Sequence, residues 1–260
     1  MRNIKLIIEY DGTGFNGWQA QRRLTPPFKV QGSRFKGERL KTIQEEIEKA
    51  GKKLFGRKIN LIGAGRTDAG VHAKAQVANF RIESTLLLNN IKNGLNKLLP
   101  RKISVVLAEE APLRFHSRFN SKGKLYKYTI INRSMRSPLV DGYSAFVPYD
   151  LNLDAIRDAA KYLIGKKDFR SFQSTNKKEK NSVRVVKKIE VISRPPLVEI
   201  YIQANGFLYN MARSIAGTLI EVGRGRFNPE KVKDILKKKH RSSAGQTAPA
   251  KGLCLEKVFY

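Results

Sequence analysis

The sequence is poor in cysteine and histidine. Its single cysteine, Cys254, excludes an internal disulfide and a zinc site built from several thiolates. The three histidines, His72, His116 and His240, lie far apart in the chain and lack the spacing of metal ligands. We therefore expect no metal site, and we interpret Cys254 as a small core residue.

Long apolar runs are also absent. No stretch approaches the roughly 20 apolar residues that a membrane-spanning helix needs, and residues 1–10 are too short and too mixed in polarity for a signal peptide. We expect a soluble, cytoplasmic protein without a membrane partner. The 260 residues, 41% of them hydrophobic, can bury one large core or two small ones.

Acidic residues are scarce. The chain has 51 basic residues against 22 acidic ones, a net charge of +29. Such a charge attracts polyanions, and nucleic acid is favoured over a lipid surface because no basic helix carries an aromatic face. An alternative explanation of the positive net charge is the lysine enrichment seen in some thermophiles, although that enrichment normally raises the glutamate content as well.

Hydrophobic periodicity divides the first half into six elements. Strands are expected at Ile4–Tyr10, Lys58–Ala64, Lys74–Ile82 and Ile103–Ala108, and helices at Thr42–Phe55 and Leu86–Leu99. Thr42 and Glu45 have the spacing of a capping box at a helix start. The order β-α-β-β-α-β is typical of the ferredoxin-like arrangement.

The second half repeats this style of element order without a repeat in residue identity. Strands are expected at Lys124–Ile130, Val183–Ser193, Leu197–Ala204 and Val258–Tyr260, and helices at Leu153–Ile164, Phe207–Val222 and Pro229–Lys239. We predict an α+β fold with two ferredoxin-like halves, residues 1–110 and 111–260. Their antiparallel-rich mixed sheets merge, with the helices on one side.

A basic, proline- and glycine-containing stretch interrupts the first half. The segment Gln21–Lys41 is expected to be a long loop, and long loops are often functional or disordered. One interpretation is an arm that grips phosphates, with Arg22 and Arg23 as substrate-binding residues. A solvated insertion without a role is equally compatible with its composition.

The sharpest local feature is the turn Gly63–Ala73, with the letters GAGRTDAGVHA, between two predicted strands. Its glycines allow a ligand to approach the backbone closely, so Asp68 can face a cleft. A phosphate-binding loop is excluded because no Gly-Lys-Ser/Thr follows and the next element is a strand. Taken alone, the turn is about equally compatible with a purely structural role.

Together with other blocks, this turn resembles the catalytic motif of the TruA family of tRNA pseudouridine synthases. The likeness spans nearly the full chain. Further blocks that resemble the family, in order, are Tyr10–Phe15, Gly17–Gln19, Thr42–Gln44, Phe115–Arg118, Tyr126–Tyr128, Phe207–Arg213 and Thr247–Leu253. The segment Gln21–Lys41 departs from the shorter loop that the family pattern leads us to expect.

The resemblance implies the pseudouridine synthase fold and an isomerase that converts uridine to pseudouridine in tRNA. That reaction consumes no redox equivalent and no group donor, so we expect no cofactor. Asp68 matches the family's essential aspartate, and Arg213 matches the arginine that pairs with it. An opposite charge within about 4–6 Å would keep a desolvated carboxylate ionised.

Two further residues acquire roles from the same resemblance. Tyr126 matches the tyrosine beside the target base, where its ring can stack and its hydroxyl can take part in removing the C5 proton. Arg66 matches the arginine next to the aspartate and is expected to bind substrate when the nucleotide leaves its stack. Without the resemblance, a tyrosine such as Tyr126 is more often a sheet core residue. Arg213 is compatible with an ordinary surface charge of a helix, but the half-buried face formed by its neighbours favours the paired role.

The resemblance also implies a homodimer with tRNA lying across both subunits. It implies target uridines in the anticodon arm, at roughly positions 38–40 of the tRNA, where a base must leave its stack to be altered. Two other classes remain open from the residues alone: an RNA-binding module without catalysis, and a basic scaffold protein. The presence of Asp68, Tyr126 and Arg213 together disfavours both.

Overall fold

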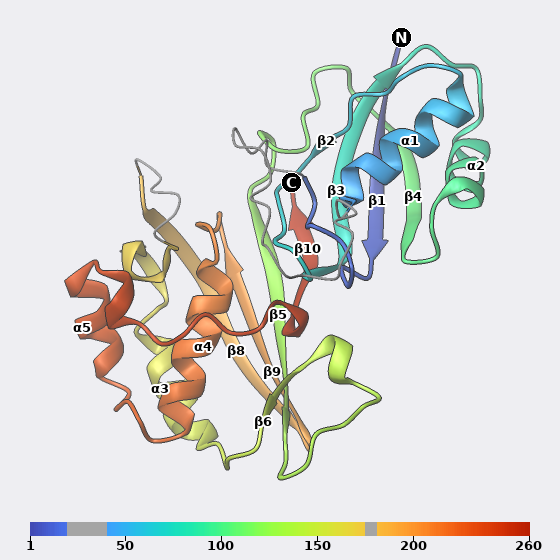
Figure 1. Cartoon of the computed structure of the whole chain (residues 1–260). Coiled ribbons are helices and arrows are strands. Elements are labelled where there is room, and N and C mark those ends of the chain that lie inside the picture. The colour runs from blue at the N-terminus through green and yellow to red at the C-terminus, as the bar shows by residue number, and fades with distance from the viewer. Residues whose placement is uncertain (20–40, 175–180) are drawn as a thin grey trace, which may run out of the picture.

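A mixed, mostly antiparallel sheet forms the centre of the molecule. The computed structural model describes residues 1–19, 41–174 and 181–260. The main sheet path runs β4-β1-β3-β10-β5-β9-β8-β7 within a 10-stranded sheet, with the two short strands β2 and β6 paired to β3 and β5 (Figure 1). In Figure 1, α1 and α4 lie over the same face of this sheet. The predicted α+β class is confirmed.

The N-terminal half follows the predicted β-α-β-β-α-β order. Its elements are β1 (Arg2–Tyr10), α1 (Ile43–Phe55), β2 (Ile62–Gly63), β3 (His72–Ile82), α2 (Leu88–Leu98) and β4 (Ile103–Ala111). The capping box at the start of α1 is confirmed, because Glu45 N–H donates to the Thr42 hydroxyl and Thr42 N–H donates to the Glu45 carboxylate.

The core of this half lies between the sheet and the two helices. Alternate residues of β1, Ile4, Leu6 and Ile8, are fully buried on one face, as the two-residue period of a strand requires. Ile47 of α1 and Ile91 of α2 are buried in the same cluster. This packing fixes β3, which follows the glycine-rich turn, and β1, which pairs with β3.

The C-terminal half adds the rest of the sheet and three helices. Its elements are β5 (Gly123–Asn132), β6 (Ala145–Val147), α3 (Leu153–Lys161), β7 (Gly165–Asp168), β8 (Val183–Arg194), β9 (Leu197–Ala204), α4 (Met211–Gly223), α5 (Lys231–Lys238) and β10 (Leu253–Phe259). Helix α4 is buried over most of its length, with Met211, Ile215 and Leu219 fully enclosed.

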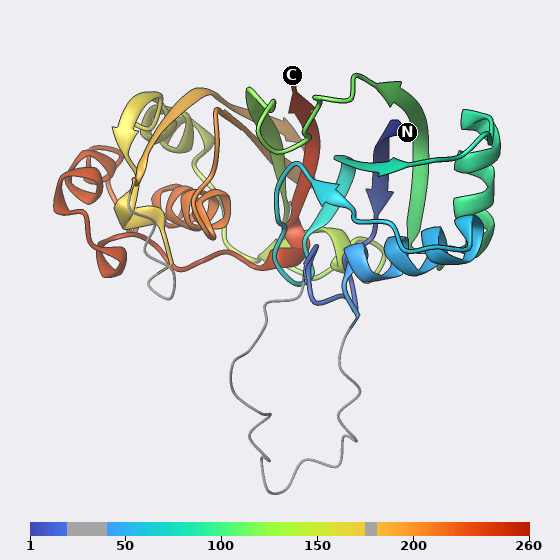
Figure 2. The same cartoon turned by 90° about the horizontal axis from the view of Figure 1, so that it is seen from above.

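Strand β10 joins the two halves. It pairs parallel to β3 through Cys254–His72 and antiparallel to β5. In Figure 2, this last strand stands between α1 and α2 on one side and α3, α4 and α5 on the other. The two predicted halves therefore share one continuous sheet, and their division at residue 110 stays a prediction.

The predicted strand Lys58–Ala64 was wrong in length, since β2 contains only Ile62 and Gly63. Side chains of α1 take the place of a partner strand there. The Gln44 amide donates to the Leu61 carbonyl at 3.1 Å, and Leu61 N–H donates to the Glu48 carboxylate at 3.1 Å. Their hydrogen bonds satisfy backbone groups that would otherwise join a ladder.

Other boundaries also differ from the predictions. Helix α4 begins at Met211 rather than Phe207, because Asn210 has a left-handed backbone with φ of 62°. Pro229 precedes α5 instead of lying in its first turn. Strand β10 begins at Leu253, five residues before the predicted start. The strands β6 and β7 were not predicted.

Candidate active site

The turn that carries Asp68 is fixed to its surroundings through Thr67 and Gly65. The Tyr10 and Thr67 hydroxyls lie 2.7 Å apart in a buried hydrogen bond, and Trp18 N–H donates to the Thr67 carbonyl at 3.1 Å. The Gln76 amide donates to the Gly65 carbonyl at 3.0 Å. The backbone just before Asp68 is therefore held by β1, β3 and the segment that follows β1.

Two glycines of the opening motif explain how that segment comes so close. A Cβ at Gly12 would lie 2.1 Å from the Val71 carbonyl oxygen, and one at Gly17 would lie 2.4 Å from the Thr67 carbonyl oxygen. Gly17 also has φ of +75°, which side-chain-bearing residues rarely adopt. Larger residues here would push the turn away from β1.

His72 closes the far end of the turn. Its Nδ1 lies 3.1 Å from the Gly12 nitrogen and 3.2 Å from Asp11 Oδ1, and its Nε2 lies 3.0 Å from the Gly142 carbonyl oxygen. The ring also contacts Tyr143, with ring centres 4.9 Å apart. His72 thus ties the turn to the segment 141–143 and is a positioning residue.

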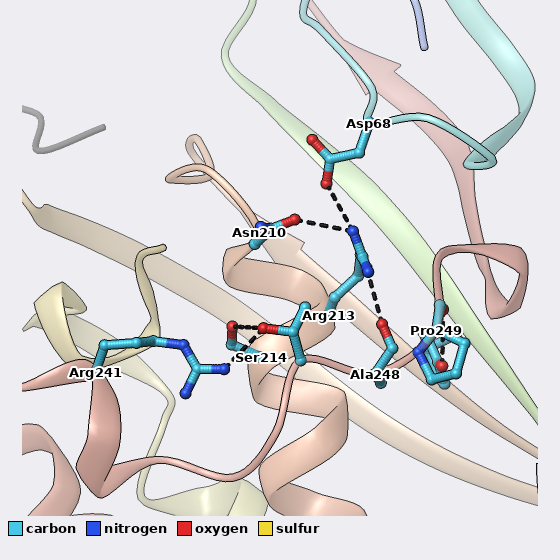
Figure 3. Close-up of polar contacts among 9 residues, drawn as sticks. Asp68, Asn210, Arg213, Ser214, Arg241, Ala248 and Pro249 are labelled. Carbon is cyan, nitrogen blue, oxygen red and sulfur yellow. Dashed lines mark hydrogen bonds and ion pairs between the residues drawn. The ribbon is translucent and has the colours of Figure 1, made fainter. Parts of the chain in front are cut away.

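Asp68 and Arg213 form an ion pair. Arg213 Nη1 lies 3.3 Å from Asp68 Oδ2, and the two side chains are only 17% and 22% exposed (Figure 3). Arg213 is oriented by two other acceptors: its Nε donates to the Ala248 carbonyl at 2.8 Å, and Nη1 donates to Asn210 Oδ1 at 2.9 Å. The guanidinium favours the ionised form of the Asp68 carboxylate.

The C-terminal signature lies along α4 and completes this arrangement. Ala248 N–H donates to the Arg213 carbonyl at 3.2 Å, and Arg241 donates to the Thr247 hydroxyl at 2.7 Å. The Tyr128 hydroxyl donates to the Pro249 carbonyl at 2.9 Å. These hydrogen bonds keep the Ala248 carbonyl in place to accept the hydrogen bond from Arg213 Nε, which Figure 3 shows.

Tyr126 lies on β5 close to Asp68. Its side chain is buried, and the Phe207 ring meets it edge-on with ring centres 4.8 Å apart. Burial raises the pKa of Tyr126 far above its ordinary value, and the nearby Tyr10 and the Asp68 charge raise it further. The phenol therefore stays neutral near pH 7, so it can donate or relay a proton but is not a phenolate base.

The structure brings three of the predicted site residues together and leaves others apart. Asp68, Arg213 and Tyr126 lie close together, and Arg66 is exposed on the same turn as Asp68. Arg22 and Arg23 lie outside the described residues and stay predictions.

Sequence reasoning missed the orienting roles of Asn210, Phe207 and the Ala248 carbonyl. Only Asn210 left a signal, because it precedes Arg213 by three residues and so lies near it at the helix start.

Within the described ranges, no group of three or more His, Cys, Asp or Glu residues is placed to hold a metal ion. The described helices are all too short or too polar to cross a bilayer. Cys254 is half-buried rather than fully enclosed.

Known proteins match this chain along its length. The family described as "tRNA pseudouridine synthase" matches residues 6–120 and 159–260. Proteins named tRNA pseudouridine synthase A from Caldicellulosiruptor bescii, Clostridium acetobutylicum and Acetivibrio thermocellus are 45%, 43% and 40% identical over 260 residues, covering 100% of both chains. A chain in the crystal structure of a Cbf5-Nop10-Gar1 complex matches at 12% identity and a TM-score of 0.40, over 82% of this chain and 44% of that chain, a likeness too distant to decide anything.

Proposed function

Because this chain belongs to the tRNA pseudouridine synthase family, we propose that it converts uridine to pseudouridine in tRNA with Asp68 as its catalytic carboxylate. The α+β architecture described above is that of the pseudouridine synthase fold. The reaction breaks the bond from ribose C1′ to N1, turns the uracil and joins C5 to C1′. Product and substrate are isomers, so the chemistry consumes no second reactant.

The ion pair of Asp68 is the observation that carries this proposal. A carboxylate on a glycine-bearing turn, 3.3 Å from a guanidinium that two other acceptors hold in place, is kept ionised and fixed in direction. Both the covalent and the glycal routes need a charged oxygen at this point, as nucleophile or as base.

Tyr126 and Arg66 are proposed to act on the same nucleotide. The neutral Tyr126 phenol next to Asp68 supports stacking on the uracil and a part in moving the C5 proton. Arg66 is exposed on the turn, two residues before Asp68, where a cation can contact the extruded nucleotide. Arg22 and Arg23 are proposed to bind phosphates on the strength of their charge alone.

The substrate position and the assembly are also proposals. We place the target uridines in the anticodon arm, and we place the enzyme in the cytoplasm, with its tRNA. We propose a homodimer, which large exposed apolar side chains support: Leu139 is 91% exposed and Met135 is 73% exposed. Light scattering at defined concentrations would measure the mass, and a monomer at micromolar concentration would contradict the dimer.

The variant Asp68→Asn tests the catalytic assignment. Asparagine keeps the shape of the side chain but removes the charge, so we expect no pseudouridine in tRNA and tRNA binding within a few fold of the wild type. Asp154→Asn, an exposed change at the start of α3, is the matched control and should leave turnover unchanged. Normal isomerisation by Asp68→Asn would contradict the proposal.

A further inference from the structure

Lys124 lies beside the proposed catalytic turn. It precedes Tyr126 by two residues on β5, so both side chains point to the same face of the sheet. Its side chain extends to Gly65, where its Cε is 2.9 Å and its Nζ 3.4 Å from the position that a Cβ on Gly65 would take. The ammonium group therefore lies next to the backbone three residues before Asp68.

The charge of Lys124 has no compensating anion within the described ranges of the chain. No hydrogen bond or ion pair of its side chain is found there, and its charged neighbour is another cation, Arg118. Burial, and then the charge of Arg118, lower the pKa of Lys124. Holding a half-buried cation beside a second one is unfavourable unless an anion joins them.

Gly65 explains how this arrangement is accommodated. Gly65 is not among the residues with positive φ, so its backbone conformation is open to any amino acid. What Gly65 supplies is space, because any side chain at this position would collide with the end of Lys124. A glycine in the catalytic motif thus keeps the ammonium group of Lys124 at its place.

We propose that Lys124 is a substrate-binding residue that contacts a phosphate flanking the target uridine, and that Gly65 keeps its side chain in position. This inference rests on the proposed function. Residues two apart on a strand are about 6.6 Å apart, which is comparable with the span from a base to the phosphate of its own nucleotide. With the uracil against Tyr126, a flanking phosphate comes within reach of Lys124.

The proposed contact forms when the nucleotide leaves its stack, so it acts on the reaction more than on overall affinity. The remaining surface of a protein with net charge +29 binds the other phosphates whether or not the base is extruded. A contact that exists only in the extruded state lowers the barrier without tightening the ground state. Loss of a hydrogen bond between two charged groups in the transition state lowers the reaction rate roughly 10- to 100-fold.

Two variants remove the contact in different ways. Lys124→Met removes the charge and keeps the length of the side chain. Gly65→Ala keeps Lys124 but displaces the flexible end of its side chain, which leaves the backbone in place. We expect both to lower the single-turnover rate at saturating enzyme by about 10- to 100-fold, with the Kd for tRNA within about threefold and the melting temperature unchanged.

Lys122→Met is the matched control, because Lys122 is exposed just before β5 and loses the same charge. A neutral methylphosphonate in place of the phosphate on either side of the target uridine identifies the partner. At one of the two positions it should slow the wild type as much as Lys124→Met does. It should then slow Lys124→Met no further.

Equal rates for Lys124→Met and the wild type would overturn the inference, as would additive effects of Lys124→Met and both methylphosphonates. A loss of affinity alone, matching that of Lys122→Met, would also overturn it. Failure of the proposed function has a different signature, since the wild type itself would then form no pseudouridine in tRNA.

Discussion

The ion pair between Asp68 and Arg213 allows a quantitative prediction for Arg213→Met. At the observed 3.3 Å, two unit charges attract by about 5 kcal/mol for an effective dielectric constant near 20. Partial solvation of both side chains offsets about half of this, which leaves about 2–3 kcal/mol. If that energy keeps Asp68 charged and aligned in the transition state, the single-turnover rate constant should fall about 30- to 150-fold.

The assay is single-turnover pseudouridine formation in tRNA with enzyme in excess, at pH 6 and at pH 8. Without the guanidinium, protonation of Asp68 is easier, so the loss of rate should be larger at pH 6 than at pH 8. Arg213→Lys should be intermediate, because one ammonium group cannot reproduce the planar fork that reaches Ala248, Asn210 and Asp68 together.

Arg224→Met, at the C-terminal cap of the same helix, provides the control. Arg224 pairs with Glu221 at the same distance, 3.3 Å, with side chains of similar exposure, but it lies about 16 Å from Arg213 along α4. The Arg224→Met variant should have a lower free energy of unfolding but the wild-type rate of pseudouridine formation. The reasoning is refuted if Arg213→Met turns over at the wild-type rate, or if Arg224→Met is equally slow.

Three further outcomes are expected. Tyr126→Phe keeps the ring and loses the hydroxyl, so the rate should fall roughly 100-fold and an isotope effect from deuterium at uridine C5 should appear; an unchanged rate and no isotope effect would exclude a role for the hydroxyl. Burial, and then the charge of Glu256, raise the pKa of Cys254 to about 12, so ~1 thiol in 10⁴ is ionised at pH 8. Iodoacetamide should therefore label the native protein far more slowly than the unfolded one, and equal rates would contradict this burial. Deletion of Arg22–Lys41 should weaken tRNA binding and flatten its salt dependence, whereas an unchanged slope would show that these residues contact no phosphate.

Local patterns in the sequence predicted much of the secondary structure. The start of α1 follows from Thr42 and Glu45, because a capping box involves only neighbouring residues. The β2 prediction failed because side chains of α1 bind the backbone of Leu61, a contact between segments that periodicity does not report.

The site itself could not be derived from spacing. Asp68 and Arg213 are 145 residues apart, and only the fold brings them together. The resemblance to a family supplied the pair before the structure placed it. Lys124 stayed unrecognised because a lysine on a strand is usually a solvated charge, and only its position against Gly65 distinguishes it.

The central position of β10 has a consequence for biosynthesis. This strand follows all the other described strands in the chain, yet it is hydrogen-bonded on both sides, to β3 and to β5. A nascent chain on the ribosome can fold α1 and α2 against β1 early, but the two parts of the sheet cannot close until residue 259 has emerged. A premature stop codon at position 253 would therefore leave the turn of Asp68 and the helix of Arg213 attached to two pieces of sheet that no strand joins.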